Sequence, residues 1–167
     1  MPKIIENLRG QILEEAKRQI YEHGYEKTTV RSVAQGCGIA VGTVYNYFKS
    51  KDILIASFVL QDWEDCISSI ARHPKENRRV YLEFIYISLK HFGQKHNRLF
   101  TDKDAAKTFN SAFYERHKML RKQLSELIRP ITYDDFCAEF VAEALLCWTM
   151  ADRSFDEIYA LLPEQIK

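Results

Sequence analysis

The sequence has few residues that break helices, with only six glycines and four prolines among 167 residues. Apolar residues are frequent, at 46%, and many recur at intervals of three or four positions. That period is typical of amphipathic helices. The scarcity of breakers and this spacing together predict an all-α protein with enough apolar residues to bury a core.

Long apolar runs are also missing. The longest candidate, residues 140–150, is interrupted by Glu143, and no run approaches the roughly 18 residues that a membrane helix requires. The first residues become amphipathic at once and include Glu6, whereas a signal peptide has an unbroken apolar region. We therefore expect a soluble cytoplasmic protein that makes no membrane contact.

Motifs of catalysis and metal binding are absent as well. The sequence has no P-loop, G-x-G-x-x-G, H-E-x-x-H or nucleophile elbow, which argues against an enzyme. His91 and His96 are five positions apart and so do not share a helical face. The cysteines form no C-x-x-C pair and are interpreted as small buried hydrophobes. We expect no cofactor and no metal site. The four cysteines are Cys37, Cys66, Cys137 and Cys147.

Acidic residues are missing from one segment. Residues 28–51 contain three basic residues and no acid. Residues 1–51 hold eight basic and five acidic residues, whereas the remainder holds 16 and 18, so the net charge of +1 conceals a basic N-terminal part. A basic segment without acids suits a surface that contacts phosphates.

Helical spacing and end signals divide the chain into predicted helices. Thr29, Ser50 and Ser154 are expected N-caps, and Gly24 is suited to the left-handed position after a helix. Pro74 is expected to end the helix that begins after Ser50. The other expected helices span residues 5–23, 30–36, 41–47, 77–94, 104–128, 133–151 and 155–162, with a short connecting element at 97–102.

Residues 28–51 combine two short predicted helices with a tight turn. Gly38 adopts positive φ there at no steric cost, and the small Ala34 lets two helices cross closely. Four apolar side chains are spaced to pack against the first helix: Val33, Ile39, Val44 and Phe48. This arrangement is a helix-turn-helix, whose second helix enters the major groove of DNA.

The second helix of this motif presents the rest of its side chains outward. Hydroxyls of Thr43 and Tyr45 bond phosphates or base edges, and Gly42 permits close approach of the backbone. Lys51 begins the next helix, where its ammonium faces a phosphate. Thr29 is expected both to cap its helix and to contact phosphate. The outward set on the helix is Val41, Gly42, Thr43, Tyr45, Asn46 and Tyr47.

At these residues the chain resembles the TetR family of bacterial regulators. The resemblance covers residues 8 to 54, with Ala40 where a serine is common and Cys37 where an alanine is common. It implies that Arg31 contacts DNA at the start of the second helix and that Lys51 contacts a phosphate. The contacts that it implies on the recognition helix are Val41, Gly42, Thr43, Tyr45 and Tyr47. The residues that carry it are Thr29, Val33, Ala34, Gly38, Ile39, Gly42, Thr43, Val44, Tyr45, Tyr47, Phe48, Lys49 and Lys51.

The resemblance also implies the organisation of the whole chain. Residues 1–50 are expected to form the three-helix DNA-binding head, and residues 51–167 a helical body for effector binding and dimerisation. A homodimer would bind two half-sites of double-stranded operator DNA. Its interface is expected in the last two long helices, the alternative being an intramolecular core. The interface candidates are Phe136, Phe140, Ala144 and Trp148.

The resemblance also implies an effector pocket between the head and the dimerising helices. Few charges interrupt the apolar faces there, so the unidentified small-molecule effector is expected to be lipophilic or aromatic. The pocket candidates are Trp63, Cys66, Tyr81, Phe84, Phe92, Phe109, Phe113 and His117.

The predicted function is therefore that of a repressor that an effector releases from a palindromic operator. In this mechanism the ligand favours a state in which the fourth helix changes the spacing of the two heads. The alternative is a helix-turn-helix protein without a small-molecule sensor, regulated by a protein partner or acting architecturally.

Overall fold

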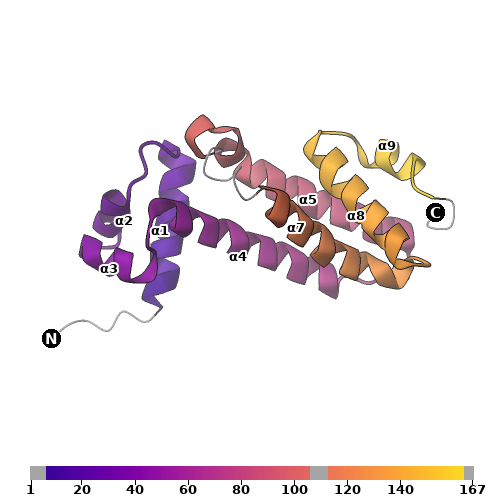
Figure 1. The fold of residues 1–167 in the computed structure, drawn as a ribbon, viewed down its shortest axis with the longest axis horizontal. Helices are drawn as coiled ribbons and strands as arrows, with labels where there is room; N and C mark the ends of the chain where they lie inside the picture. Colours follow the sequence, from indigo (N-terminus) through magenta and orange to yellow (C-terminus); the bar gives the residue numbers. More distant parts are fainter. Residues whose placement is uncertain (1–6, 106–112, 164–167) are drawn as a thin grey trace. The chain divides into compact units, whose positions relative to one another are not determined.

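The protein was examined as a computed structural model that describes residues 7–105 and 113–163, and the side chains of these residues except 113–116. The described residues form helices joined by short turns, with no strand among them (Figure 1). The helices are α1 (Leu8–His23), α2 (Val30–Gly36), α3 (Val41–Tyr47), α4 (Lys51–Arg72), α5 (Arg78–Thr101), α7 (Phe113–Ile128), the 3-10 helix η1 (Arg129–Ile131), α8 (Asp135–Met150) and α9 (Phe155–Ala160). The expected all-α fold is confirmed. Within the described ranges, no helix combines the length and apolar character needed to cross a membrane.

Helix ends that have a local signal lie where the sequence predicts them. Thr29 caps α2 by accepting a 3.0 Å hydrogen bond from the backbone N–H of Ser32, and Ser50 accepts one of 3.2 Å from Ile53. Gly24 follows α1 with a φ of 85°. The residue pair His73–Pro74 follows α4, as expected from the restriction that proline places on its predecessor.

The prediction of a connecting element at residues 97–102 is wrong, because α5 continues to Thr101. His96 and Leu99 are almost fully buried and extend the buried face of α5 by two more steps of helical spacing. Asp102 then interrupts the helix, and its Oδ1 accepts hydrogen bonds of 3.0 Å from the backbone N–H groups of Asp104 and Ala105. Part of the helix predicted at 104–128, residues 106–112, lies outside the described residues.

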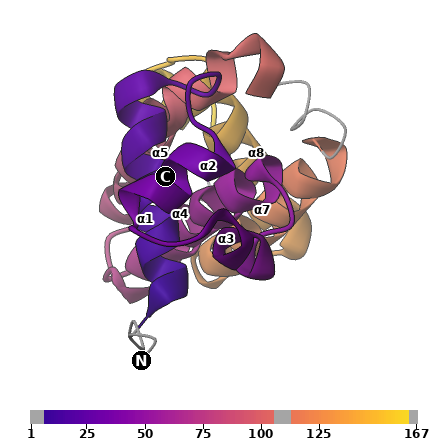
Figure 2. The same cartoon turned by 90° about the vertical axis from the view of Figure 1, so that its left-hand side faces the viewer.

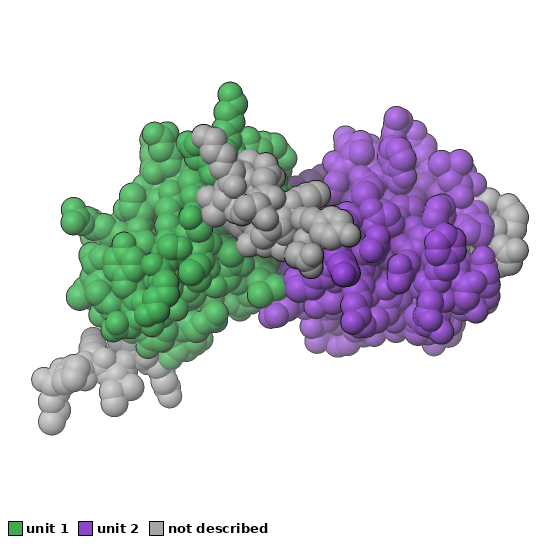
Figure 3. All heavy atoms as spheres, in the orientation of Figure 1, with its two compact units in different colours: residues 1–62, 96–110 green, residues 63–95, 111–167 purple. Residues whose placement is uncertain are grey.

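The chain forms two compact units (Figure 3). Unit 1 comprises residues 1–62 and 96–110, and unit 2 comprises residues 63–95 and 111–167. Unit 1 therefore contains more than the first 50 residues, because α4 and the end of α5 contribute to one apolar core with α1, α2 and α3. Core residues from these two helices are Leu54, Ile55, Phe58 and Leu99.

A buried carboxylate connects three helices of unit 1. Oδ1 of Asp62 on α4 accepts a 2.7 Å hydrogen bond from the ammonium of Lys17 on α1, and Oδ2 lies 3.1 Å from Nε2 of His96 on α5. The Tyr21 hydroxyl lies 3.3 Å from Nδ1 of His96, and the Phe58 ring stacks on the imidazole. A carboxylate in the protein interior is costly unless it is paired, so these partners specify which faces of α1, α4 and α5 meet.

In unit 2, α7 and α8 lie side by side (Figure 1). Their fully buried residues include Leu124 and Ile128 on α7 and Val141 on α8. A Cβ atom at Gly93 of α5 would lie 2.9 Å from Sδ of Met150, so the glycine allows α5 and α8 to approach closely. Unit 2 is thus a packed helical body in which α8 contacts α5 and α7, which precede it in the chain, and α9, which follows it.

The interpretation of all four cysteines as buried hydrophobes is wrong for three of them. Cys137 is buried, but Cys37 and Cys66 are half-buried and Cys147 is exposed. Cys147 lies on the solvent-facing side of α8, which it shares with Phe140, rather than on the side that packs against the rest of unit 2.

Replacing Asp62 with alanine removes the carboxylate that the half-buried Lys17 ammonium and the buried His96 imidazole both face. We expect the free energy of unfolding to fall by about 3–5 kcal/mol, measured by chemical denaturation. Asp65→Ala, at an exposed position on the same helix, is the matched control and should change stability by less than about 0.5 kcal/mol. Similarly small effects of both substitutions would contradict this role of Asp62.

Candidate nucleic-acid interface

The start of α2 is fastened to α1 by a chain of hydrogen bonds (Figure 2 shows the two helices beside each other). Thr29 and Ser32 form a capping box, in which each side chain accepts from the other's backbone N–H. The Ser32 hydroxyl donates to Oε1 of Gln19 at 2.6 Å, and the Gln19 amide donates back to the Ser32 carbonyl at 3.0 Å. Gln19 is only 5% exposed on α1, so the position of α2 is fixed by a buried, doubly bonded amide.

The turn after α2 has the conformation expected of a helix-turn-helix. Gly38 has a φ of 66°, a value that L side chains adopt only with strain. The backbone N–H of Ile39 bonds to the Ala34 carbonyl at 3.0 Å and closes the turn. Val44 on α3 and Phe48 after it are buried in the core of unit 1, as predicted. These anchors determine which side of α3 faces outward.

The outward side of α3 carries two exposed tyrosines. Tyr45 and Tyr47 are 45% and 46% exposed, Gly42 and Asn46 are also exposed, and Val41 and Thr43 are half-buried. Large aromatic residues usually lose more of their surface to the core, so two of them on one short helix suit a surface that a partner covers.

A groove of about 500 Å³ separates α3 from the starts of α2 and α4. It unites five of the nine predicted DNA-binding residues, from three segments of the chain, and its lining contains basic residues and no acid. The exposed Arg31 and Lys49 lie on its rim. The lining residues are Thr29, Val30, Arg31, Val41, Tyr45, Lys49, Ser50 and Lys51. A basic groove without acids suits a phosphate backbone.

Lys51 lines this groove but is also held within unit 1. Its ammonium donates to the Tyr25 carbonyl and lies 3.6 Å from the centroid of the Tyr25 ring. Burial lowers the pKa of Lys51, against the opposing effect of nearby carboxylates such as Asp52. The Tyr25 hydroxyl in turn donates to Asp52 at 2.5 Å. To bind a phosphate directly, Lys51 has to exchange the Tyr25 carbonyl for a phosphate oxygen.

No neighbouring atom among the described residues requires a glycine at position 42. A Cβ atom built at this position meets nothing within 4 Å, and the residue is exposed within α3. Glycine in a helix costs roughly 1 kcal/mol relative to alanine, and packing within unit 1 does not offset that cost. The open space in front of Gly42 is therefore available to a partner that approaches the helix backbone.

Some residues predicted to line an effector pocket take part in separate packing contacts of unit 2. The Trp63 indole donates to Oε1 of Gln123 at 2.7 Å, and its ring meets Phe92 edge-on at 5.4 Å between centroids. The Tyr81 hydroxyl donates to the Leu127 carbonyl at 3.2 Å, and burial raises the pKa of Tyr81 to about 12.

The other pocket candidates are more dispersed. Phe84 stacks on an imidazole, Cys66 is half-buried with its pKa raised to about 11 by burial, and His117 pairs with a carboxylate of α8. Phe109 and the side chain of Phe113 lie outside the described residues. Their assignment to a pocket stays a prediction.

The predicted interface residues of α8 share its solvent-facing side. Phe136 is 78% exposed, Phe140 46% and Trp148 49%, whereas Ala144 is half-buried. Tyr133, just before the helix, is 62% exposed. This part of unit 2 thus presents a row of aromatic side chains that no described residue covers.

The segment that builds the interface also matches a known family. Residues 12–58, from α1 into α4, match the family model described as "Bacterial regulatory proteins, tetR family". Over these residues the chain is similar to the TetR family. The match contains both helices of the helix-turn-helix and the groove between α2, α3 and α4, so the expected resemblance is confirmed for the residues that form the TetR-type head.

Individual TetR-family relatives extend the similarity. The regulator UidR of Escherichia coli K12 is 33% identical over 91 residues, which are 52% of this chain and 46% of UidR. The fatty acid metabolism regulator of Bacillus subtilis is 26% identical over 119 residues, 71% of this chain and 59% of that protein. The chain thus aligns with about half the length of these curated relatives.

A solved structure supports the fold beyond the head. The B. subtilis regulator FadR, crystallised with stearoyl-CoA, has a TM-score of 0.53 and 21% identity, and the match covers 95% of this chain and 99% of that one. At this level of identity the likeness is one of fold. The likeness of fold includes the helices of unit 2.

Two residues that position the TetR head were not predicted, Gln19 and Tyr25. Gln19 lies seven residues after Ile12 and three after Ala16, on the buried face of α1, so a polar residue at apolar spacing was the available signal. Tyr25 follows Gly24, and its contacts with α4 have no local sequence signal because they join residues 26 and 27 positions apart.

Replacing Gly42 with alanine is expected to separate folding from DNA binding. Unit 1 gains up to about 1 kcal/mol of stability from the better helix former, because the new methyl group meets no protein atom. The same methyl group obstructs close approach of DNA to α3, so affinity for an operator duplex that the unchanged chain selects from random DNA should fall. Thermal unfolding and fluorescence anisotropy with labelled duplex measure the two effects. Gln35→Ala, an exposed position on α2, is the control, and unchanged affinity of Gly42→Ala would contradict the close approach.

Proposed function

We propose that this chain is a homodimeric, sequence-specific DNA-binding regulator that represses transcription by occupying a palindromic operator. The observation that carries the proposal is the basic groove beside α3, which lies in the segment matched by the TetR family model. Tyr45 and Thr43 would bond base edges and phosphates from α3, while Thr29, Arg31 and Lys51 hold the flanking backbone. No catalytic role is proposed, and the proposed binding to operator DNA supports a location in the bacterial cytoplasm.

Two copies are needed because one short recognition helix reads few base pairs. The exposed aromatic row on α8, with Phe136, Phe140 and Trp148, supports a second copy as the partner. Exposed apolar patches of this kind are typical of protein interfaces, and a twofold axis pairs each patch with itself. Two heads related in this way would meet half-sites roughly 34–36 Å apart or at a multiple of that spacing.

We propose that unit 2 responds to a lipophilic effector with a long acyl chain. Trp63, Tyr81 and Phe92 pack in the interior of unit 2, so a site that opens among them would suit a lipophilic ligand. A fatty acid metabolism regulator is also among the relatives. The similar fold crystallised with stearoyl-CoA supports an acyl thioester as the first compound to test. The effector would act by binding more tightly to a state with low operator affinity than to the state with high affinity.

The alternative keeps the DNA-binding head without a small-molecule sensor. In that case a protein partner regulates the chain, or it acts architecturally. Specific operator binding that stearoyl-CoA does not weaken at any concentration favours a protein partner. Binding that depends on salt but not on sequence favours an architectural role.

Selection of bound sites from random duplex DNA, at a stated salt concentration, tests the operator. We expect an enriched palindrome, and each of Tyr45→Ala and Thr43→Ala should lower affinity for it by about 5- to 150-fold, as expected for a lost contact of about 1–3 kcal/mol. Gln35→Ala should bind as the unchanged chain does. The same operator complex, titrated with stearoyl-CoA and with free CoA as control, then tests release by the effector. No enriched sequence would overturn the operator-repressor function.

Disruption of the aromatic row on α8 tests the dimer. The double variant Phe136→Glu, Phe140→Glu places two charges where a second copy would pack, and charges are depleted from the centres of interfaces. We expect sedimentation to show a monomer and operator affinity to fall at least about tenfold, since only one head then binds. Ile87→Glu on α5, where Ile87 is 54% exposed, is the matched control. A dimer that survives the double substitution would refute this interface.

A further inference from the structure

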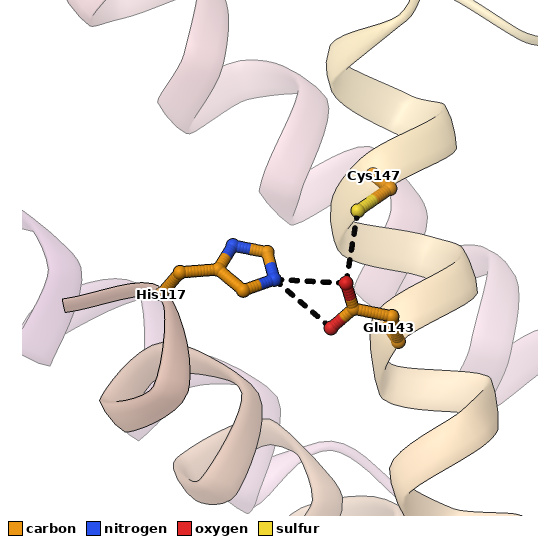
Figure 4. Close-up of side chains that lie close together, drawn as sticks. All are labelled: His117, Glu143 and Cys147. Carbon is orange, nitrogen blue, oxygen red and sulfur yellow. Dashed lines mark hydrogen bonds and ion pairs between the residues drawn. The ribbon is translucent and has the colours of Figure 1, made fainter. Parts of the chain in front are cut away.

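Three side chains with metal-binding atoms converge in unit 2 (Figure 4). Nε2 of His117 on α7 lies 2.9 Å from each carboxylate oxygen of Glu143 on α8. Sγ of Cys147, one turn further along α8, donates to Oε1 of Glu143 at 3.2 Å. The three possible ligand atoms lie within 4.8 Å of one another.

The packing of two helices produces this convergence. Glu143 and Cys147 are four residues apart and so lie on one face of α8. His117 comes from α7, 26 residues before Glu143, and reaches them because α7 and α8 lie side by side. Each of the three side chains therefore extends from a regular helix of the same unit, so the positions of their backbones are fixed relative to one another.

The distances are close to those of a zinc site. Zinc binds imidazole nitrogen, carboxylate oxygen and thiolate sulfur at about 2.0–2.3 Å, which separates tetrahedral ligand atoms by roughly 3.3–3.7 Å. Glu143 Oε1 lies 2.9 Å from His117 Nε2 and 3.2 Å from Cys147 Sγ, so these pairs need to open only by fractions of an ångström. The third pair, His117 Nε2 and Cys147 Sγ, lies within 4.8 Å and has to approach by about 1 Å at most for a tetrahedral site.

We propose that His117, Glu143 and Cys147 bind a zinc ion in unit 2, with the fourth position left to water. One imidazole, one carboxylate and one thiolate suit a borderline-soft cation rather than Mg²⁺ or Ca²⁺, which prefer oxygen ligands. The two negative ligands balance the charge of the ion. The site is partly exposed on all three side chains, so a cation from solution has access.

Neighbouring groups assign different roles to the two carboxylate oxygens. Oε1 is the oxygen that Cys147 contacts, and Oε2 lies 3.8 Å from Nη1 of Arg121. Oε1 thus becomes the metal ligand, while the Arg121 guanidinium holds Oε2 and orients the carboxylate, as outer-shell partners do in known metal sites.

The simpler reading is an ion pair between His117 and Glu143 that joins α7 to α8. It leaves the thiol of Cys147 without a function, although Cys147 lies exposed beside the pair. The two readings make different predictions for an added metal ion, because an ion pair alone neither binds cobalt nor places a sulfur next to it. The zinc site does not depend on the proposed operator binding and can be tested without DNA.

Cobalt titration of the full chain, after chelator treatment and in the presence of a reductant, tests the site. We expect one Co²⁺ per chain, with a thiolate-to-cobalt charge-transfer band that added Zn²⁺ abolishes. Cys147→Ser should remove that band, and His117→Ala should weaken Co²⁺ binding at least about tenfold, since loss of even an outer-shell group costs 10- to 100-fold. Cys66→Ser and His91→Ala lie outside the cluster and should retain the band and the affinity.

A second measurement covers variants that are less stable. Zn²⁺ should raise the midpoint of thermal unfolding of the unchanged chain, because it binds the folded state, and should not raise that of Cys147→Ser. Absence of the charge-transfer band in the unchanged chain, or its persistence in Cys147→Ser, overturns the proposal. Operator selection from random DNA is a separate measurement. Its result tests the operator proposal whether or not the cobalt band appears.

Discussion

The buried Asp62 carboxylate is the constraint on which the arrangement of unit 1 depends. It faces Lys17 of α1 and His96 of α5, so a single residue of α4 sets the contact between three helices. The same α1 holds the start of α2 through Gln19, and α2 leads through the Gly38 turn into α3. A recognition helix of seven residues gains little stability by itself. Its orientation depends, through α2, on α1. The orientation of α1 depends in turn on buried polar pairs as well as on apolar packing.

Sequence patterns predicted the parts of the fold that local signals control. The bounds of α2 and α3 follow from the Thr29 cap, the Gly38 turn and the spacing of Val33 and Val44, all within a few residues of the ends that they set. The end of α5 was missed because the buried face continues through His96, a polar residue that hides the apolar period. Its partners Tyr21 and Asp62 lie 75 and 34 positions away, and no spacing in the sequence announces contacts over such separations.

The same contrast between local signals and long-range contacts applies to the candidate sites. The groove beside α3 was predictable because its residues lie within one segment of 23 residues, from Thr29 to Lys51. The cluster of His117, Glu143 and Cys147 was not, because half of its geometry comes from the packing of α7 against α8. The sequence contains only the spacing of Glu143 and Cys147, which is common on helices without any ligand. Local motifs therefore reveal a site made by one segment, and structure is needed for a site made by two.

The two proposals for unit 2 meet on one face of α8. Glu143 and Cys147 lie between Phe140 and Trp148 along this helix, and the aromatic side chains are exposed around them. A second copy that covers the aromatic row also removes water from the carboxylate and the thiol. Removing water from a carboxylate and a thiolate is costly, and a bound cation would offset that cost by neutralising both groups. Zinc binding and dimerisation on this face would then be linked, and by reciprocity each would strengthen the other by the same factor. A charged cluster within an apolar interface is thereby a means of making the assembly depend on an ion.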